Sequence, residues 1–224
     1  MSYVSPMMAR DAIIKMKEFH EDLIEIHEKY HLDFFQDLGR RNILMSRPQE
    51  VFFSQEIKKH FPSTVSDGRT GQPDILVPEI NKELECKITT KRKGGSWSFQ
   101  ADYATRERKG TCDFLYVCCD PKFENFGVFY FRDLTIADFK PPASGSRGKS
   151  RLLLRNCIDR CECLVGSMEN RNTQFMLKAA SRMLFAQTDD EEKAAKKSYN
   201  YWLTNPASYT IKLEEIQACT FLSL

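Results

Sequence analysis

Apolar residues near the start of the chain recur at helical spacing. Over residues 9–38 the apolar positions Met16, Phe19, Leu23, Ile26 and Tyr30 lie three or four residues apart, which predicts an amphipathic helix. This apolar seam covers only about two heptads, which is too short for a coiled coil. We therefore expect it to pack against the protein's own core, with pairing to a second subunit as the alternative.

A second helix is predicted over residues 46–60. Residues 46–49 read Ser-Arg-Pro-Gln, which resembles a capping box with proline in the first turn, and Phe53, Ile57 and Phe61 form an apolar face. Glu50 lies three residues before Phe53 and so on the same face. A carboxylate that faces the core needs a cation or a metal. Alternatively, Glu50 lies at the rim near the helix N-terminus, where the helix dipole favours it.

The pattern changes to strand spacing after a turn-like stretch at residues 66–71. Residues 75–77 predict a short strand, residues 78–82 a connection, and residues 83–90 a second strand. Polar and apolar residues alternate along the second strand, so that one face carries Glu83, Glu85 and Lys87 and the other carries Leu84, Cys86 and Ile88. We expect the two strands to form a hairpin that brings Asp74 close to Glu85.

The remaining pattern predicts a mixed α/β fold with a central mixed β-sheet flanked by helices. We expect a single domain over residues 1–224, with a core at about 46–135 and flanking helices at about 9–38 and 168–203. The further predicted elements are a helix at 98–109, buried strands at 114–119 and 126–131, a basic loop at 141–149, helices at 172–187 and 190–203, and a strand at 208–213.

Composition narrows the class of protein. The 224 residues carry a net charge of only +2, so a surface for nucleic acid has to come from local clustering of basic residues. There is neither an apolar run of transmembrane length nor a basic segment followed by an apolar core at the N-terminus. We expect a soluble, cytoplasmic protein that does not bind membranes.

The eight cysteines are interpreted as reduced thiols. The spacing of Cys157, Cys161 and Cys163 raises zinc as the alternative. Structural zinc usually has four ligands in paired spacings, and none of the four histidines lies beyond residue 60. Thiols are therefore the favoured interpretation.

Asp74 and Glu85 have a chemical use if the hairpin holds them side by side. Two carboxylates in contact repel each other unless a cation lies between them. Carboxylate oxygens are the ligands that Mg²⁺ prefers, and the bound ion can serve phosphate chemistry. Lys87 projects on the same strand face as Glu85, where it can neutralise a phosphate or help orient or deprotonate a water molecule.

These residues resemble a known family. Pro73-Asp74, ten intervening residues and then Glu85-Cys86-Lys87 look like the PD-(D/E)XK nuclease signature, and the hairpin after a helix is most similar to type II restriction endonucleases. The resemblance implies a PD-(D/E)XK endonuclease-like core in which Asp74, Glu85 and the backbone carbonyl of Cys86 bind Mg²⁺. It implies Lys87 as the catalytic lysine and Glu50 as an extra catalytic carboxylate. It also implies a homodimer that cleaves double-stranded DNA at specific sequences without a small-molecule cofactor.

Basic sequence follows the motif at once. Residues 87–109 contain seven basic and two acidic residues, a local excess in a nearly neutral chain. Phosphate contacts dominate affinity for DNA, so this segment and the loop after residue 143 are the expected DNA-binding surfaces. The expected DNA-binding residues are Lys91, Arg92, Lys93, Ser96, Trp97, Gln100, Arg106, Arg147 and Lys149.

Other interpretations remain open. A repair or recombination nuclease of the same fold would recognise DNA structure rather than sequence. A non-catalytic DNA-binding protein would use the Glu85–Lys87 pair only to stabilise an edge hairpin, as many sheets do. In that case the basic segment could be a solvated loop that aids solubility.

Overall fold

The computed structural model describes residues 2–67, 72–91, 97–103, 107, 110–142, 144 and 148–217. The chain divides into two compact units. The larger comprises Met1–Gly166 with Leu213–Leu224, and the smaller comprises Ser167–Lys212. Among the described residues, no helix is both long and apolar enough to cross a membrane.

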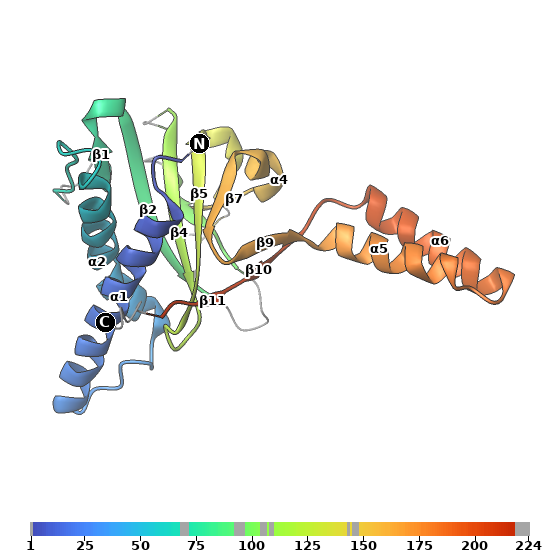
Figure 1. Cartoon of the computed structure of the whole chain (residues 1–224), viewed down its shortest axis with the longest axis horizontal. Coiled ribbons are helices and arrows are strands. Elements are labelled where there is room, and N and C mark those ends of the chain that lie inside the picture. The colour runs from blue at the N-terminus through green and yellow to red at the C-terminus, as the bar shows by residue number, and fades with distance from the viewer. Residues whose placement is uncertain are drawn as a thin grey trace, which may run out of the picture. The chain divides into compact units, whose positions relative to one another are not determined.

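A mixed β-sheet forms the centre of the larger unit (Figure 1). Its strand order is β1-β2-β4-β5-β11, with β8 also paired to β5. The β2–β4 pair is parallel and every other pair in this sheet is antiparallel. The prediction of a mixed α/β fold with a central mixed sheet is therefore confirmed. The strands are β1 (Ile75–Val77), β2 (Lys82–Thr90), β4 (Cys112–Cys119), β5 (Asn125–Leu134), β8 (Cys161–Val165) and β11 (Glu214–Glu215).

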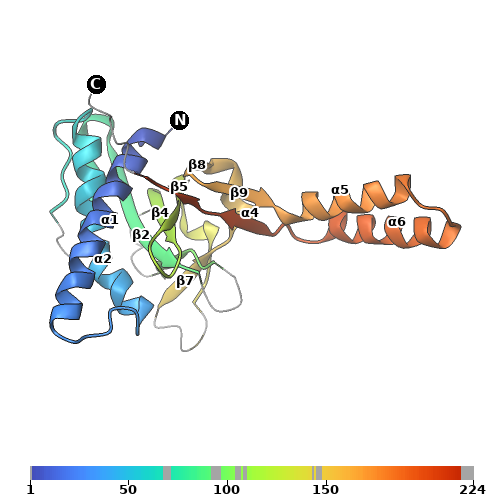
Figure 2. The same ribbon diagram turned by 60° about the horizontal axis from the view of Figure 1, so that its bottom comes forward.

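Two helices, α1 (Pro6–Lys29) and α2 (Leu38–Lys58), cover one face of this sheet (Figures 1 and 2). They bury Ile13, Met16, Phe53 and Ile57 completely. The sheet contributes alternate residues of its strands, since side chains at every second position share a face. Those at the core are Leu84, Cys86, Leu115, Val117, Cys119, Val128 and Tyr130. The apolar face predicted for the second helix is confirmed.

The seam of the first helix is used mainly inside the protein. Met16 is buried, and Phe19 and Leu23 pack against the core. Only the last turn remains outside, since Ile26 is 51% and Tyr30 65% exposed. Packing on the protein's own core is thus the main use of the seam, and the homodimer stays a prediction.

The ends predicted for the first helix were wrong. Ser5 caps α1 by accepting a hydrogen bond from the Met8 amide, and Pro6 occupies its first turn. The helix stops at Lys29 because His31 adopts a left-handed conformation (φ 57°), which an α-helix cannot continue. The Leu32 amide then donates to the carbonyl of His27 and closes the end of the helix.

The start predicted for the second helix was also wrong. Asp37, rather than Ser46, is the N-cap of α2, since its side chain accepts hydrogen bonds from the amides of Gly39 and Arg40. Ser46 lies inside the helix and donates its hydroxyl to the carbonyl of Ile43. Pro48 therefore stands in the helix interior, where it lacks the amide hydrogen of an ordinary residue.

The other face of the central sheet packs against a second, three-stranded sheet of order β3-β7-β6. Phe99 precedes β3, and its ring lies 4.9 Å from the ring of Tyr116 and 6.1 Å from that of Phe129. The ring of Phe139 likewise packs against this face, with its centre 5.5 Å from the centre of the Phe114 ring. The strands are β3 (Gln100–Asp102), β6 (Phe139–Lys140) and β7 (Lys149–Leu152), followed by the short helix α4 (Leu154–Cys157).

The helix predicted at residues 98–109 was wrong for its first part. Gln100–Asp102 is a strand that pairs with Lys149–Arg151 of β7. Of the remainder, Tyr103 and Glu107 are helical, and residues 104–106, 108 and 109 lie outside the described part. The predicted buried strands, by contrast, are confirmed as β4 and β5.

The smaller unit consists of a helical hairpin on a two-stranded antiparallel sheet. Helices α5 (Arg171–Leu184) and α6 (Asp189–Thr204) pack side by side, with Phe175 stacked on Trp202 at 4.4 Å (Figures 1 and 2). The sheet pairs β9 (Ser167–Asn170) with β10 (Tyr209–Lys212). The three elements predicted in this region are confirmed, whereas their flanking of a catalytic core stays a prediction.

The cap at Asp37 can be tested against the predicted cap at Ser46. Asp37→Ala should lower the free energy of unfolding by about 1 kcal/mol, because two amides of the first turn lose their acceptor. Ser46→Ala should change it by no more than a few tenths, about the net effect of an exposed helix substitution. Urea unfolding followed by Trp97 fluorescence in a Trp202→Phe background reports on the larger unit. A larger loss for Ser46→Ala would contradict this assignment.

His20 is a buried titratable group in the helical core. It is 3% exposed and its ring stacks on Phe123 at 4.4 Å. Burial and the nearby charge of Arg41 lower its pKa from 6.5 to about 4, against a weaker opposite effect of Asp120. The folded protein therefore binds this proton more weakly than the unfolded chain does.

His20 should make the protein less stable in acid. Because its pKa is lower in the folded state, the stability it contributes is complete above pH 6.5 and is lost as the pH falls towards 4, by about 3 kcal/mol. His20→Phe keeps an aromatic ring against Phe123 and should remove that loss. Unfolding free energies at pH 7 and pH 4 measure the difference, with exposed His60→Gln as control. Equal acid losses in wild type and His20→Phe would refute the prediction.

Candidate functional site

The hairpin of β1 and β2 places two carboxylates next to each other. The strand pairing ends at Ile75 and Leu84, so Asp74 and Glu85 follow on adjoining strands. Asp74 Oδ2 accepts a hydrogen bond from the Cys86 amide at 2.7 Å. Glu85 is only 7% exposed. The expected approach of the two acids is therefore present.

Lys87 lies between these acids. Its ammonium nitrogen is 2.9 Å from Asp74 Oδ2, 3.0 Å from Glu85 Oε2 and 2.8 Å from the backbone oxygen of Cys86. We call this group of four residues the Lys87 cluster. The three oxygen atoms come from different residues and converge on one positive charge.

The charge state of Lys87 follows from these contacts. Burial by itself lowers the pKa of the ammonium group, but Glu85 and Asp74 outweigh it, so that the pKa of Lys87 lies above its ordinary value. Lys87 is thus a cation at neutral pH in this arrangement. As long as it holds both carboxylates, it cannot accept a proton from water.

The donor set of the Lys87 cluster suits a divalent cation. Two carboxylate oxygens and a carbonyl oxygen are hard ligands, the kind that Mg²⁺ binds while retaining several waters. All three already lie within 3.0 Å of one ammonium nitrogen. Asp74, Glu85 and the Cys86 carbonyl could therefore hold Mg²⁺. Within the described residues no set of three or more His, Cys, Asp or Glu side chains forms a metal site.

Helix α2 reaches the Lys87 cluster through Gln49, a residue that the sequence pattern did not single out. Gln49 is fully buried, and its Nε2 atom donates to the backbone oxygen of Lys87 at 3.3 Å. Its Oε1 atom has no hydrogen-bond partner among the described residues. Gln49 precedes Phe53 by four residues, so the same helical periodicity that drew attention to Glu50 also places Gln49 on the inner face.

Glu50 lies beside the cluster without joining it. Its side chain is 16% exposed and forms an ion pair with Arg47 at 2.8 Å. Burial raises the pKa of Glu50, while Arg47 opposes the shift. Arg47 also donates to the hydroxyl and carbonyl oxygens of Ser66 and so ties α2 to the segment before the hairpin. The position near the helix N-terminus is therefore wrong, because α2 begins at Leu38 and Glu50 lies well inside it. Glu50 is half-buried, and Arg47 of the same helix is its partner cation.

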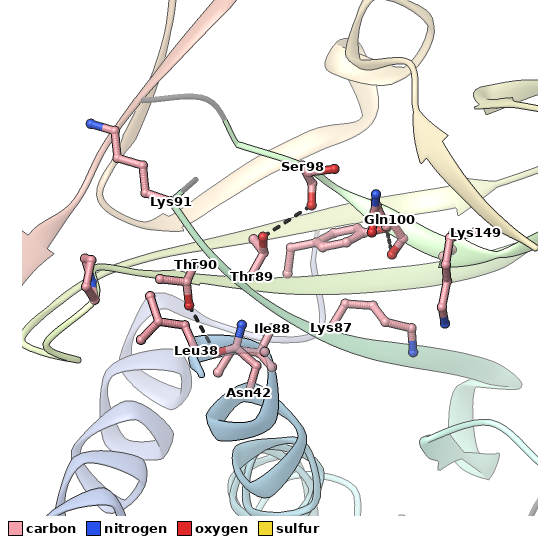
Figure 3. Close-up of a pocket in the computed structure, with 14 residues that line it drawn as sticks. Leu38, Asn42, Lys87, Ile88, Thr89, Thr90, Lys91, Ser98, Gln100 and Lys149 are labelled. Carbon is pink, nitrogen blue, oxygen red and sulfur yellow. Dashed lines mark hydrogen bonds between the residues drawn. The ribbon is translucent and has the colours of Figure 1, made fainter. Parts of the chain in front are cut away.

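A cleft of about 980 Å³ opens next to Lys87 and follows β2 to Lys91 (Figure 3). Its other walls come from the first turns of α2 and from β3, β7 and Tyr116. None of the described residues that line it is acidic. In Figure 3 the side chains of Lys87 and Lys149 extend towards the same end of the cleft, and Lys91 lies at the other end.

The predicted DNA-binding residues fall into three groups. Lys91, Gln100 and Lys149 line the cleft. Trp97 is half-buried just before β3 and is not part of the lining. The positions outside the described residues are Arg92, Lys93, Ser96, Arg106 and Arg147.

The cysteines in the described part of the chain are free thiols. The side chain of Cys86 is turned into the helical core, so only its backbone faces the Lys87 cluster. Cys157, Cys161 and Cys163 range from buried to exposed. Burial raises the pKa of the Cys157 thiol to about 12 and that of Cys163 to about 11. Thiols with such values are protonated at neutral pH and are poor nucleophiles.

Comparison of the chain with models of protein families, with curated proteins and with solved structures gives no match.

Gln49 can be tested as the link between α2 and the Lys87 cluster. Gln49→Met keeps the length of the side chain but removes the donor to the Lys87 carbonyl, so the free energy of unfolding should fall by about 1 kcal/mol. Exposed Gln55→Met on the same helix is the control and should change it by no more than a few tenths. Equal effects of the two substitutions in urea unfolding would contradict the link.

Proposed function

We propose that the protein is a Mg²⁺-dependent endonuclease that hydrolyses phosphodiester bonds of double-stranded DNA at specific sequences, as type II restriction enzymes do. The observation that carries this proposal is the convergence of Asp74, Glu85 and the Cys86 carbonyl on Lys87, at the end of a lysine-lined cleft. A cluster of hard oxygen ligands next to an anion-binding cleft is what phosphodiester hydrolysis requires.

Each residue of the cluster would have a separate role in the reaction. A divalent cation held by Asp74, Glu85 and the Cys86 carbonyl would supply Lewis-acid polarisation of the phosphate. Lys87 is a cation in the present contacts, which favours neutralising a phosphate oxygen. A role as general base would require Lys87 to lose its carboxylate contacts, since these raise its pKa. Gln49 would hold the strand that carries Lys87 against α2.

The central sheet supports the same proposal. The two acids lie on a hairpin that follows a helix, and the next strand, β4, runs parallel to β2. This order of elements agrees with the resemblance seen in the motif. A homodimer with one active site for each DNA strand belongs to the same proposal, and sedimentation with and without DNA tests it.

Isosteric variants of the acids test the catalytic site. Asp74→Asn retains an acceptor for the Cys86 amide, and Glu85→Gln retains the shape of the side chain, but each removes the charge of a metal ligand. Both should abolish Mg²⁺-dependent cleavage of unmethylated DNA of mixed sequence. Mn²⁺ should replace Mg²⁺, whereas Ca²⁺, whose geometry is less strict, should support binding with little cleavage. Exposed Glu21→Ala is the control and should cleave like the wild type.

The outcomes of this digestion separate the interpretations. Discrete fragments indicate sequence-specific cleavage, and a smear or cutting only at branches indicates a structure-specific nuclease. Cleavage that persists in excess chelator, or that survives in Asp74→Asn, would overturn the site. If the wild type cleaves DNA with neither metal, the Lys87 cluster is a structural ion pair rather than a catalytic site.

Lys87 can be tested separately from the acids. Lys87→Ala leaves both carboxylates in place and should lower the cleavage rate by about a hundred- to ten-thousand-fold. Lys87→Arg retains the positive charge but does not deprotonate in proteins. Substantial activity of Lys87→Arg would therefore assign an electrostatic role to Lys87, and activity as low as that of Lys87→Ala would assign the role of base. Unchanged cleavage by Lys87→Ala would exclude both roles.

A further inference from the structure

The cleft next to the Lys87 cluster lies beside the part of β2 that β1 does not pair with. β1 pairs with β2 only over Lys82–Leu84, so the following part of β2 has no strand from β1 beside it. The stretch from Lys87 to Lys91 forms one wall of the cleft. Ser98, Gln100 and Ala101 form another. The distance along a strand from residue 87 to residue 91 is about 13 Å, a length that a few nucleotides of one strand can span.

The size of the cleft limits what can enter it. At about 980 Å³ it has the volume of a pocket for a small ligand rather than that of a surface for a macromolecule. A few unpaired nucleotides of one strand fit this volume.

The lining carries cations that are available to a ligand. Lys91 and Lys149 are exposed, and neither makes an ion pair within the described part of the chain. Lys87, by contrast, is already paired with two carboxylates. With no acid in the described lining and lysines at both ends, the cleft favours anionic groups at its two ends.

The lining also carries groups that suit bases. The side-chain amide of Gln100 makes no hydrogen bond within the described residues, since only its backbone oxygen accepts one, from Tyr116. Asn42 uses its Oδ1 atom for Thr90 and Arg41, which leaves its amide nitrogen for the cleft. Amide side chains pair well with base edges, and an unpaired base exposes the edge that a duplex hides.

We propose that this cleft binds a short unpaired stretch of a DNA strand next to the phosphate that is cut. Cleavage of a duplex at a specific sequence then involves the unpairing of a short stretch beside the cut. DNA that already carries unpaired nucleotides there, such as a flap, should therefore bind more tightly than an intact duplex. The identity of the ligand rests on the proposed nuclease function, whereas the size and donors of the cleft do not.

Binding without metal tests the inference separately from catalysis. The probes are a blunt duplex of mixed sequence, the same duplex with a short single-stranded flap, and the single strand, all with the same labelled strand. Fluorescence anisotropy of the full chain in chelator should give at least about tenfold tighter binding of flap and single strand than of blunt duplex, since each stacked or paired base adds to affinity. Equal affinities would overturn the inference.

Variants of the cleft locate the binding. Gln100→Ala should remove most of the preference for unpaired DNA, and Lys91→Ala should lower the slope of log affinity against log salt by about 0.7, the value for one phosphate contact on a single strand. Both side chains lack partners in the described part of the chain, so folding should not suffer. Exposed Lys178→Ala on α5 is the matched control. Retention of preference and slope in both cleft variants would overturn the inference.

The two proposals can fail independently. If flap and blunt duplex bind equally while wild type, but not Asp74→Asn, cleaves DNA with Mg²⁺, the cleft inference fails and the nuclease function stands. If the preference depends on Gln100 and Lys91 but no metal supports cleavage, the cleft is a binding site for unpaired DNA and the nuclease function fails. If no DNA binds, both fail.

Discussion

The ion pair of Lys87 with Asp74 and Glu85 is the interaction on which the candidate site depends. Glu85 is nearly buried, and a carboxylate in that position without a partner would be strongly destabilising. Removing one member of a buried pair typically costs about 3–5 kcal/mol, because the other charge is left uncompensated. The cluster therefore requires a cation at all times. Lys87 provides it here, and a divalent ion could take over the same oxygens.

The place of this cluster follows from the hydrogen-bond needs of a strand edge. Where β1 ends, β2 presents backbone groups that have no strand to pair with, and such groups need other partners when they are buried. Side chains supply them. Asp74 accepts from the Cys86 amide, and Lys87 donates to the Cys86 carbonyl. The residues that satisfy the edge are thus the residues that assemble the site.

Local patterns in the sequence predicted the hairpin and the buried strands well. Alternation along residues 83–90 is strong, and the turn signals around it are clear, so both strands and their faces could be predicted. The short strand at Gln100–Asp102 could not, because it is stabilised by pairing with β7, almost fifty residues away in the chain. The start of α2 was missed because Ser46 and Pro48 imitate a helix beginning, whereas the Asp37 side chain provides the real cap.

The hydrogen-bond and ion-pair partners of the side chains decide which residue of α2 meets the hairpin. Spacing placed Glu50 on the inner face of α2. The same spacing also fits Gln49, and it cannot tell which of the two meets the hairpin. Arg47, one turn earlier, pairs with the half-buried Glu50, and the neutral amide of Gln49 is the group that reaches the strand. Burying an amide that has a backbone partner costs less than burying a carboxylate, which explains the choice.

The core fixes the orientation of the site through the period of the strand. Leu84 and Cys86 are buried against the helices, and residues at odd positions of β2 must then face the opposite side. A slip of one residue would bury Glu85 and Lys87 in the apolar core and expose Leu84, which no arrangement of charges could offset. Cys86 therefore has two structural roles, one for its side chain, which has no polar partner in the cluster, and one for its backbone. Its thiol holds the strand in register from one side, while its amide and carbonyl anchor Asp74 and Lys87 on the other.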